Sequence, residues 1–453
     1  MMARKIMLGL LMLAIMILPG MVFAAEQPAQ SQVEVLTLDQ CLDLALEKSQ
    51  KIKEADKKVE KAKAELRAAA GALWPSLDYM LGYSKLSDPV VLGSKPKVVN
   101  GIPDFNNWET IEGEDYGYAG SISLTQPLYT GGKLSGALKL AKLQLEIAKE
   151  DQRKTKQTLI YDVKSAYYKV WLAEQMAVVA QTSYDNMGHH YQQIKNFYKV
   201  GTASKFDLLQ AQVQWEGKKP TVIKAQNGLA LAKLNLITIL GIDKNRQFDV
   251  TCDLDKLQLP EDIAQQYQQV LEVAYKYRSE IHQVEIGIEV SKVKAHMEKA
   301  GYKPNVALTG SYDRKGTDLS MDDDKTWKLT LGIEGNLFDG FTTLNKVSAA
   351  KDDIDLAKIK ETSTHDLIRL DVEQSLQGLK ESLETTKANQ SNIDLAKEAL
   401  RLTQARFDAG MATTMDIMDS QLALDHALNG YYEGVSSYLT ALAKMDLAMG
   451  KDQ

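Results

Sequence analysis

Four segments of the chain alternate regularly between apolar residues and small or polar residues. In one of them Trp327 and Leu329 alternate with Lys328 and Thr330, and the pattern continues to Leu337. A period of two residues is typical of a β-strand with one apolar face. Each segment is about 9–12 residues long, which matches a tilted strand of an outer-membrane barrel, and the polar faces suit a wet lumen better than a core. The pattern predicts strands over 76–84, 116–126, 304–313 and 326–337.

The residues between these strands follow a different period. Over 133–198 no proline occurs, and an apolar seam that includes Leu159, Val163, Ala166 and Val170 alternates steps of four and three. This spacing is the signature of coiled-coil helices. At ~1.5 Å per residue the helix would span roughly 100 Å, and in each half of the chain two shorter helices laid end to end match that length. We expect helices over 38–73, 133–198, 204–240, 265–300, 342–407 and 413–449, with a kink at Pro220.

This order of elements occurs twice, and short sequences recur with it. Leu128-Tyr129-Thr130-Gly131 corresponds to Leu337-Phe338-Asp339-Gly340, and Val200-Gly201 corresponds to Ala409-Gly410. A duplicated unit decides the architecture before any local pattern does. We expect a first repeat over 25–241 with an extra loop over 85–115, a linker at the waist over 242–262, and a second repeat over 263–453.

Residues 1–24 have the features of a secretory signal peptide. Arg4 and Lys5 precede an apolar run that leads to a small-residue cleavage site at Ala24. The run of about 13 residues is shorter than the roughly 20 that a spanning helix needs. The net charge of −6 becomes more negative when the signal is removed, so nothing favours nucleic acid as a partner. Export permits a disulfide between Cys41 and Cys252, but two isolated buried thiols are the simpler interpretation.

Four strands are too few to close a barrel within one chain. In lipid the unpaired backbone groups of an open sheet edge cost several kcal/mol each, so the barrel has to be shared between subunits. Two chains would supply eight strands around a filled interior, whereas three would supply twelve and leave room for a channel. The expected fold class is mainly α with membrane β. Aromatic residues at the strand ends resemble a membrane-interface girdle: Trp74, Tyr129, Tyr302, Phe338 and Phe341.

The order of elements, the duplication, the paired turns and the segment Thr-Gln-Pro-Leu-Tyr-Thr-Gly-Gly at 125–132 resemble the TolC family of outer-membrane efflux proteins. The resemblance covers nearly all of the chain after the signal peptide. It implies a homotrimer with a 12-stranded barrel in the outer membrane and a 12-helix coiled-coil barrel in the periplasm. It also implies two protein partners, a periplasmic adaptor (membrane fusion) protein and an inner-membrane pump. The function implied is the exit duct of a tripartite efflux or secretion system, such as type I secretion.

In that family, acidic side chains just past the second helical turn ring the narrowest, periplasmic point of the duct. They match Asp416 and Asp419 here, and Asp207 is the counterpart in the first repeat, where Gln210 stands at the other position. A ring of carboxylates would favour cations. The alternative is that Asp207 and Asp416 simply cap the starts of their helices.

The resemblance also assigns the turns between the long helices and the return helices to adaptor contact. The turn residues are Val200, Gly201, Thr202, Ala409, Gly410 and Met411. Turn chemistry alone would equally explain the two glycines. The sequence departs from well-known members at Phe407 and Ala412, where an aromatic hydroxyl and an arginine close the tip in those proteins. A closed state here must therefore depend on packing or on other pairs.

We expect no enzymatic activity, no cofactor and no metal. Gly131-Gly132-Lys133 resembles a phosphate loop, but Leu134 replaces its Ser/Thr and Pro127 stands at its first glycine. The alternative function is an exported trimeric coiled-coil adhesin or spacer without channel activity. That alternative explains the heptads but not the duplicated strands of membrane length. The sequence does not identify the cargo, which would be selected by the pump.

Overall fold

The computed structural model describes residues 34–88, 91–99, 102–112, 116–243, 248–250, 259–260 and 267–451. The signal peptide expected over 1–24 lies outside the described residues, and so does Cys252. Cys41 is a buried free thiol, and burial raises its pKa to about 11.

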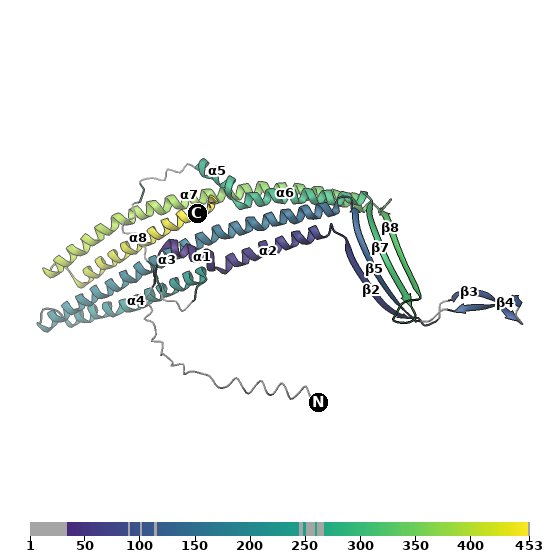
Figure 1. Cartoon of the computed structure of the whole chain (residues 1–453). Helices are drawn as coiled ribbons and strands as arrows, with labels where there is room; N and C mark the ends of the chain where they lie inside the picture. The colour runs from purple at the N-terminus through teal and green to yellow at the C-terminus, as the bar shows by residue number, and fades with distance from the viewer. Residues whose placement is uncertain are drawn as a thin grey trace, which may run out of the picture.

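The chain forms a long helical column with an antiparallel sheet at one end and two helical tips at the other (Figure 1). This arrangement confirms the expected class, mainly α with four long strands in one sheet. In the first repeat the elements are α1 (Leu38–Lys48), α2 (Gln50–Gly71), β2 (Ser76–Lys85), β5 (Tyr116–Tyr129), α3 (Lys133–Lys199) and α4 (Lys205–Leu240). In the second repeat they are α5 (Tyr267–Tyr277), α6 (Ser279–Glu298), a 3₁₀ turn (Lys299–Tyr302), β7 (Asn305–Gly316), β8 (Asp324–Glu334), α7 (Thr342–Asp408) and α8 (Thr414–Ala448).

The sheet has the strand order β2-β5-β7-β8, and every neighbouring pair is antiparallel. Its register places Tyr79 opposite Ile122, Ile122 opposite Tyr312, and Tyr312 opposite Trp327. Residues directly opposite each other share a face of the sheet, so these four form one apolar row. Within the chain, β2 and β8 each have one neighbour and form the two edges of the sheet.

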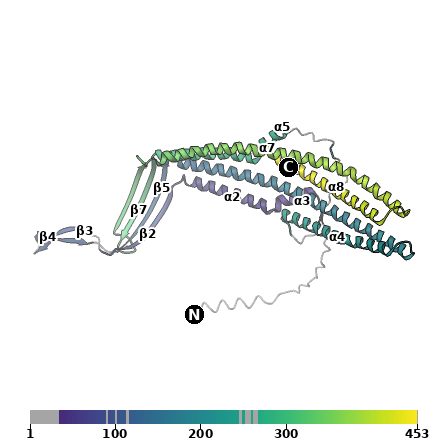
Figure 2. The same cartoon turned by 180° about the vertical axis from the view of Figure 1, so that it is seen from behind.

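Two long helices, α3 and α7, run the length of the column. Figures 1 and 2 both show α2 and α4 in line along one side of α3. The predicted seam of α3 is buried, since Leu159, Val163 and Val170 are fully covered, and it packs against α1 and α4. Another apolar cluster joins the two repeats, because Trp171 of α3 packs with residues of α7 and α8: Leu379, Leu383, Val435, Tyr438 and Leu439.

Two expected helices are interrupted, which corrects the predictions over 38–73 and 265–300. The first breaks at Ser49, between α1 and α2, and the second breaks at Arg278, between α5 and α6. At each break a glycine that ends a return helix approaches closely. A Cβ on Gly241 would lie 2.7 Å from the Lys48 carbonyl oxygen, and one on Gly450 would lie 2.9 Å from the Arg278 nitrogen. Both glycines have positive φ, of 70° and 69°, which only glycine adopts readily.

Two segments expected to be irregular contain strands. The loop over 85–115 includes a hairpin of β3 (Val91–Val99) and β4 (Ile102–Glu112), which projects beyond the sheet in Figures 1 and 2. The linker over 242–262 includes β6 (Phe248–Val250), which pairs in parallel with β1 (Glu34–Leu36). The return helix α4 is continuous through Pro220. Among the helices described, none has the length and apolar character that crossing a membrane requires.

Candidate functional site: the sheet and the helical tips

One face of the four-stranded sheet is apolar and exposed. Tyr79 is 81% exposed and Trp327 is 79% exposed. The same face carries Leu77, Leu81, Tyr83, Ile122, Leu124, Tyr312, Leu329, Leu331 and Ile333, and all of these side chains are also exposed. A contiguous apolar face of this size is not left to water in a stable protein, and marks contact with lipid or protein.

The opposite face is lined by small and charged side chains. The register places Asp78, Ser123, Ser311 and Lys328 in one row across the sheet. In the next row Asp313 accepts hydrogen bonds from Ser121 Oγ at 2.6 Å and from Ser311 Oγ at 2.9 Å. A face lined by hydroxyls and charged groups is suited to water. The alternation read from the sequence therefore separates an apolar face from a hydrophilic face.

The five predicted interface aromatics all lie where the sheet meets the helical column. Trp74 stands between α2 and β2, Tyr129 ends β5, and Tyr302 precedes β7. Phe338 and Phe341 lie between β8 and α7, with their ring centroids 5.5 Å apart in an edge-to-face arrangement. All five side chains are exposed, with Trp74 at 75%. The structure thus gathers them at the end of the sheet nearest the helices; their position in a membrane interface stays a prediction.

At the far end of the column, the two tips are built by the same local rules. In each tip the long helix ends in a glycine with positive φ, Gly201 or Gly410. The next amide reaches back to the helix: Thr202 N–H donates to the Phe197 carbonyl at 2.9 Å, and Met411 N–H donates to the Arg406 carbonyl at 2.8 Å. This backbone pattern is the Schellman motif, which satisfies the last carbonyls of a helix. All six turn residues proposed for adaptor contact are exposed.

Each return helix then begins with a capping box. Ser204 Oγ accepts from the Asp207 amide, and Asp207 accepts from the Ser204 amide at 3.1 Å. Thr413 and Asp416 repeat the arrangement, with the Thr413 amide 2.7 Å from the Asp416 carboxylate. These hydrogen bonds, the backbone one first, lower the pKa of Asp416 below its usual range. Asp207 and Asp416 therefore cap the starts of their helices, and a role for them in a constriction stays a prediction.

Asp419 lies one turn beyond Asp416 and is exposed. The start of α4 approaches the start of α8, because Gln210 Nε2 lies 3.4 Å from Met415 Sδ. Phe407, which stands where well-known members carry a hydroxyl, packs edge-on against His190 with ring centroids 4.9 Å apart. Ala412 is half-buried in the second turn.

A buried polar cluster that the sequence reading missed joins the two tip hairpins, α3–α4 and α7–α8. Asp425 of α8 accepts from Ser183 Oγ of α3 at 2.6 Å and pairs with Lys218 Nζ of α4 at 2.8 Å. Gln421 Nε2 donates to its other oxygen at 2.8 Å, and Asn186 donates to Gln421. We call Ser183, Asn186, Lys218, Gln421 and Asp425 the hairpin-joining network. Its only sequence signal is an acidic residue on a helix side that is otherwise buried.

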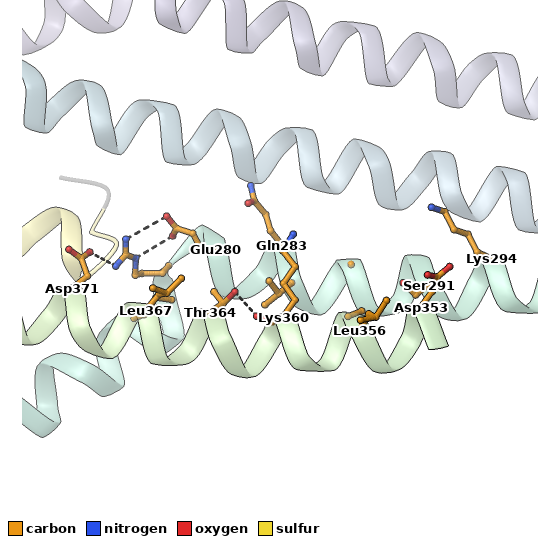
Figure 3. A pocket seen from close by; sticks show the side chains of 15 residues that line it. Glu280, Gln283, Ser291, Lys294, Asp353, Leu356, Lys360, Thr364, Leu367 and Asp371 are labelled. Carbon is orange, nitrogen blue, oxygen red and sulfur yellow. Dashed lines mark hydrogen bonds and ion pairs between the residues drawn. The ribbon is translucent and has the colours of Figure 1, made fainter. Parts of the chain in front are cut away.

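A second polar cluster lies at the waist, along a groove of about 750 Å³ between α6 and α7. Figure 3 shows Glu280 and Asp371 joined by dashed lines to one guanidinium, that of Arg278. Arg278 Nη1 lies 2.6 Å from Asp371, and Lys444 Nζ approaches Asp371 at 3.2 Å. Burial alone would raise the pKa of Asp371, but Arg278 and then Lys444 outweigh it and lower that pKa. These ion pairs hold α6, α7 and α8 together at the helix break.

In the described ranges, no group of three or more His, Cys, Asp or Glu side chains is arranged to hold a metal ion. The functional geometry is instead an apolar sheet face, a hydrophilic face behind it, and two exposed tips at the other end of the column.

The chain matches the family model described as outer membrane efflux protein over residues 41–242 and 260–451. Outer membrane protein TolC of Vibrio cholerae serotype O1 is 21% identical over 336 residues, which cover 73% of this chain and 76% of that protein. Alkaline protease secretion protein AprF of Pseudomonas aeruginosa is 22% identical over 349 residues, which cover 75% of this chain and 71% of that protein.

Among solved structures, the CmeC outer membrane channel of Campylobacter jejuni has a TM-score of 0.75 at 17% identity, covering 91% of this chain and 85% of that chain. The open state of the MtrE outer membrane channel of Neisseria gonorrhoeae has a TM-score of 0.73 at 18% identity, covering 92% of this chain and 89% of that chain. These likenesses show the same fold. Since the family model spans both repeats, the chain belongs to the outer membrane efflux protein family, whose members are exit ducts of efflux or secretion systems.

Proposed function

We propose that the protein is a homotrimeric exit duct that carries cargo from an inner-membrane pump, through a periplasmic adaptor, across the outer membrane. The observation that carries this proposal is the sheet with one exposed apolar face, one hydrophilic face and two edge strands, β2 and β8. Lipid does not tolerate open sheet edges, so β8 of one subunit has to pair with β2 of the next. Three subunits would then close a barrel of twelve strands with a wet interior.

The helical column supports the same assembly. Two helices at its sides present exposed apolar residues along their length. On α4 these are Phe206, Leu209, Val213, Ile223, Leu231 and Leu234, and on α7 they are Leu356, Ile359, Leu367, Leu370, Leu395 and Leu402. Pairing α7 of one subunit with α2 and α4 of its neighbour, which lie in line along the column, would cover both rows and continue the barrel as a helical tunnel. The resulting interface would resemble a coiled coil, which buries apolar seams of this kind.

The exposed tips indicate where the protein would contact its partners. The exposed turns, from Val200 to Thr202 and from Ala409 to Met411, have their backbone groups satisfied within the motif and present side chains outward. Such rigid, exposed ends are suited to docking another helical hairpin, which we assign to the adaptor.

Asp207, Asp416 and Asp419 would bring carboxylates of three subunits together at this end and form a cation-favouring constriction. The aromatics from Trp74 to Phe341 would mark the periplasmic surface of the membrane.

The test is planar-bilayer conductance of the detergent-extracted protein, with its mass measured by light scattering. We expect a detergent-dependent trimer with discrete, cation-selective conductance. A detergent-independent soluble oligomer without conductance would contradict the duct and favour the coiled-coil adhesin. The cargo is tested separately, by restoring export in cells that hold a defined pump and adaptor but lack their own duct.

A further inference from the structure

A buried histidine lies between the two tip hairpins without a hydrogen-bond partner. His190 of α3 is 6% exposed, and neither Nδ1 nor Nε2 has a partner within the described residues. Its ring contacts Phe407 of α7 edge-on, with an interplanar angle of 67°. A neutral imidazole carries one donor and one acceptor, and both are left unused here. Buried polar atoms are normally paired, so this orphaned ring needs an explanation.

The ring lines a solvent-open groove of about 650 Å³ between α3, α7 and α8. The charged groups around it come from two of these helices. His189 is the neighbour on α3, and α7 contributes Lys397, Arg401 and Asp408; α8 contributes only uncharged lining residues, Ile417, Gln421 and Leu424. Asp408 is already engaged, because its Oδ1 accepts from Gln193 at 2.9 Å and from Gln404 at 3.2 Å.

Protonation of His190 would weaken the packing of α7 against α3. Among the described residues neither ring nitrogen has an acceptor, and the cation Lys397 lines the same groove. Arg401 lines it too, but its guanidinium is paired with Glu398 at 2.8 Å. Burial lowers the pKa of His190, and the carboxylate of Asp408 only partly offsets that effect. If α7 moved away from α3, the ring would meet water and its pKa would return toward about 6.5. The separated arrangement therefore binds more protons than the packed one.

The direction of the pH effect follows from the linkage between proton binding and conformation. Packing of the hairpins is fully favoured above about pH 6.5, where the ring is neutral in both arrangements. As pH falls below that value, the separated arrangement gains a proton and becomes more favourable. We propose that His190 is a proton sensor between the tip hairpins, and that acid favours separation of α7–α8 from α3 and so opens the periplasmic end of the duct.

This inference rests on the proposed function, in which the tips form the mouth of a trimer. Three subunits would bring three copies of His190 to the same ring of helices, so the response to pH is steeper than that of one independent site. Asp416 does not produce the same response, because the hydrogen bonds at Thr413 lower its pKa further away from this range.

The experiment is single-channel conductance of the full-length protein between about pH 8 and pH 5, with three chains compared: wild type, His190→Phe and His189→Phe. His189 is the matched control, since it is the adjacent residue and exposed. We expect open probability of the wild type to rise several-fold on acidification. His190→Phe keeps the ring contact with Phe407 and should lose this rise, whereas His189→Phe should keep it.

An acid response that persists in His190→Phe, or a wild type whose conductance does not change with pH, would overturn the sensor while leaving the duct intact. Absence of conductance at every pH would instead contradict the proposed function.

A second measurement depends on neither conductance nor variants. It determines the pKa of His190 in the wild type by hydrogen–deuterium exchange at the imidazole C2 position. A value at or above about 6.5 contradicts the inference. His190→Gln replaces His190→Phe if the latter does not assemble.

Discussion

At the residue scale, the tips show how a few side chains satisfy the ends of helices and remain available for function. Ser204 with Asp207 and Thr413 with Asp416 form two matching capping boxes. Gly201 and Gly410 end the preceding helices in left-handed conformation. Because a capping carboxylate is held by backbone amides, it keeps its charge and its place. Asp416 is therefore suited to the proposed ring of charge, and Asp419 would extend that ring along the same helix face.

The corresponding prediction concerns ion selectivity. Asp416→Asn with Asp419→Asn removes both charges in every subunit but leaves an oxygen able to cap the helix. Cation selectivity should fall, and block by divalent cations should weaken, because the field that attracts them is lost. The measurement is the reversal potential in a salt gradient. Asp394→Asn, an exposed acid of α7 far from the turn in sequence, is the control. Unchanged selectivity and block in the double variant would show that these carboxylates serve only as caps.

At the element scale, the halves of the column are joined by contacts between helices that are distant in sequence. The hairpin-joining network connects α3, α4 and α8 through Asp425, and the waist ion pairs connect α6, α7 and α8 through Arg278 and Asp371. Both are partly or fully buried, so each charge depends on its partner. Phe407 and Ala412 supply no hydroxyl and no guanidinium at the tip, so the network around Asp425, together with the Gln193–Asp408 hydrogen bond, connects the two tip hairpins.

Lys218→Met should therefore loosen the tips. The change leaves Asp425 buried without its ion pair, although Ser183 and Gln421 still donate to it, so we expect a loss of about 2 kcal/mol. Hydrogen exchange of the α8 amides around Asp425 measures this loss as faster local opening. Lys219→Met is the matched control, because Lys219 is the next residue and is exposed. Equal exchange rates in the two variants would rule out a structural role for the pair.

At the scale of the whole molecule, the sheet within one chain is incomplete. The apolar face of β2 carries Leu77, Tyr79 and Leu81, and that of β8 carries Leu329, Leu331 and Ile333. Since side chains alternate between the faces, any pairing of β8 with β2 of a neighbour has to keep these residues on the same side. A shift by one residue would move these apolar side chains to the hydrophilic face.

Whether these residues share a face across the subunit interface can be checked by cross-linking in a background of Cys41→Ala and Cys252→Ala. Tyr79→Cys is combined in turn with Leu329→Cys, Leu331→Cys or Ile333→Cys, and with Thr330→Cys as the control on the opposite face. We expect an oxidised, covalent trimer from at least one of the first three pairs, because their side chains share a face across the interface. The Thr330 pair should give none. Cross-linking through Thr330 alone would mean that the proposed barrel register is wrong.

Much of this architecture could be read from local patterns. The alternation around Trp327 identified a strand and its two faces because a strand exposes alternate residues regardless of what it contacts. The seam at Leu159 and Val163 identified a long packed helix for the same reason. The turns at Gly201 and Gly410 were recognisable because the left-handed conformation that ends a helix there favours glycine.

Other features were decided only by the tertiary structure. The helix breaks at Ser49 and Arg278 occur where Gly241 and Gly450, roughly two hundred residues away in the first case, meet the backbone. The partners of Asp425 and the unpartnered burial of His190 likewise depend on which helices are neighbours. Periodicity along a chain specifies which side of an element is covered. It does not specify what covers that side, because contacts between distant segments are set by how whole helices pack against one another.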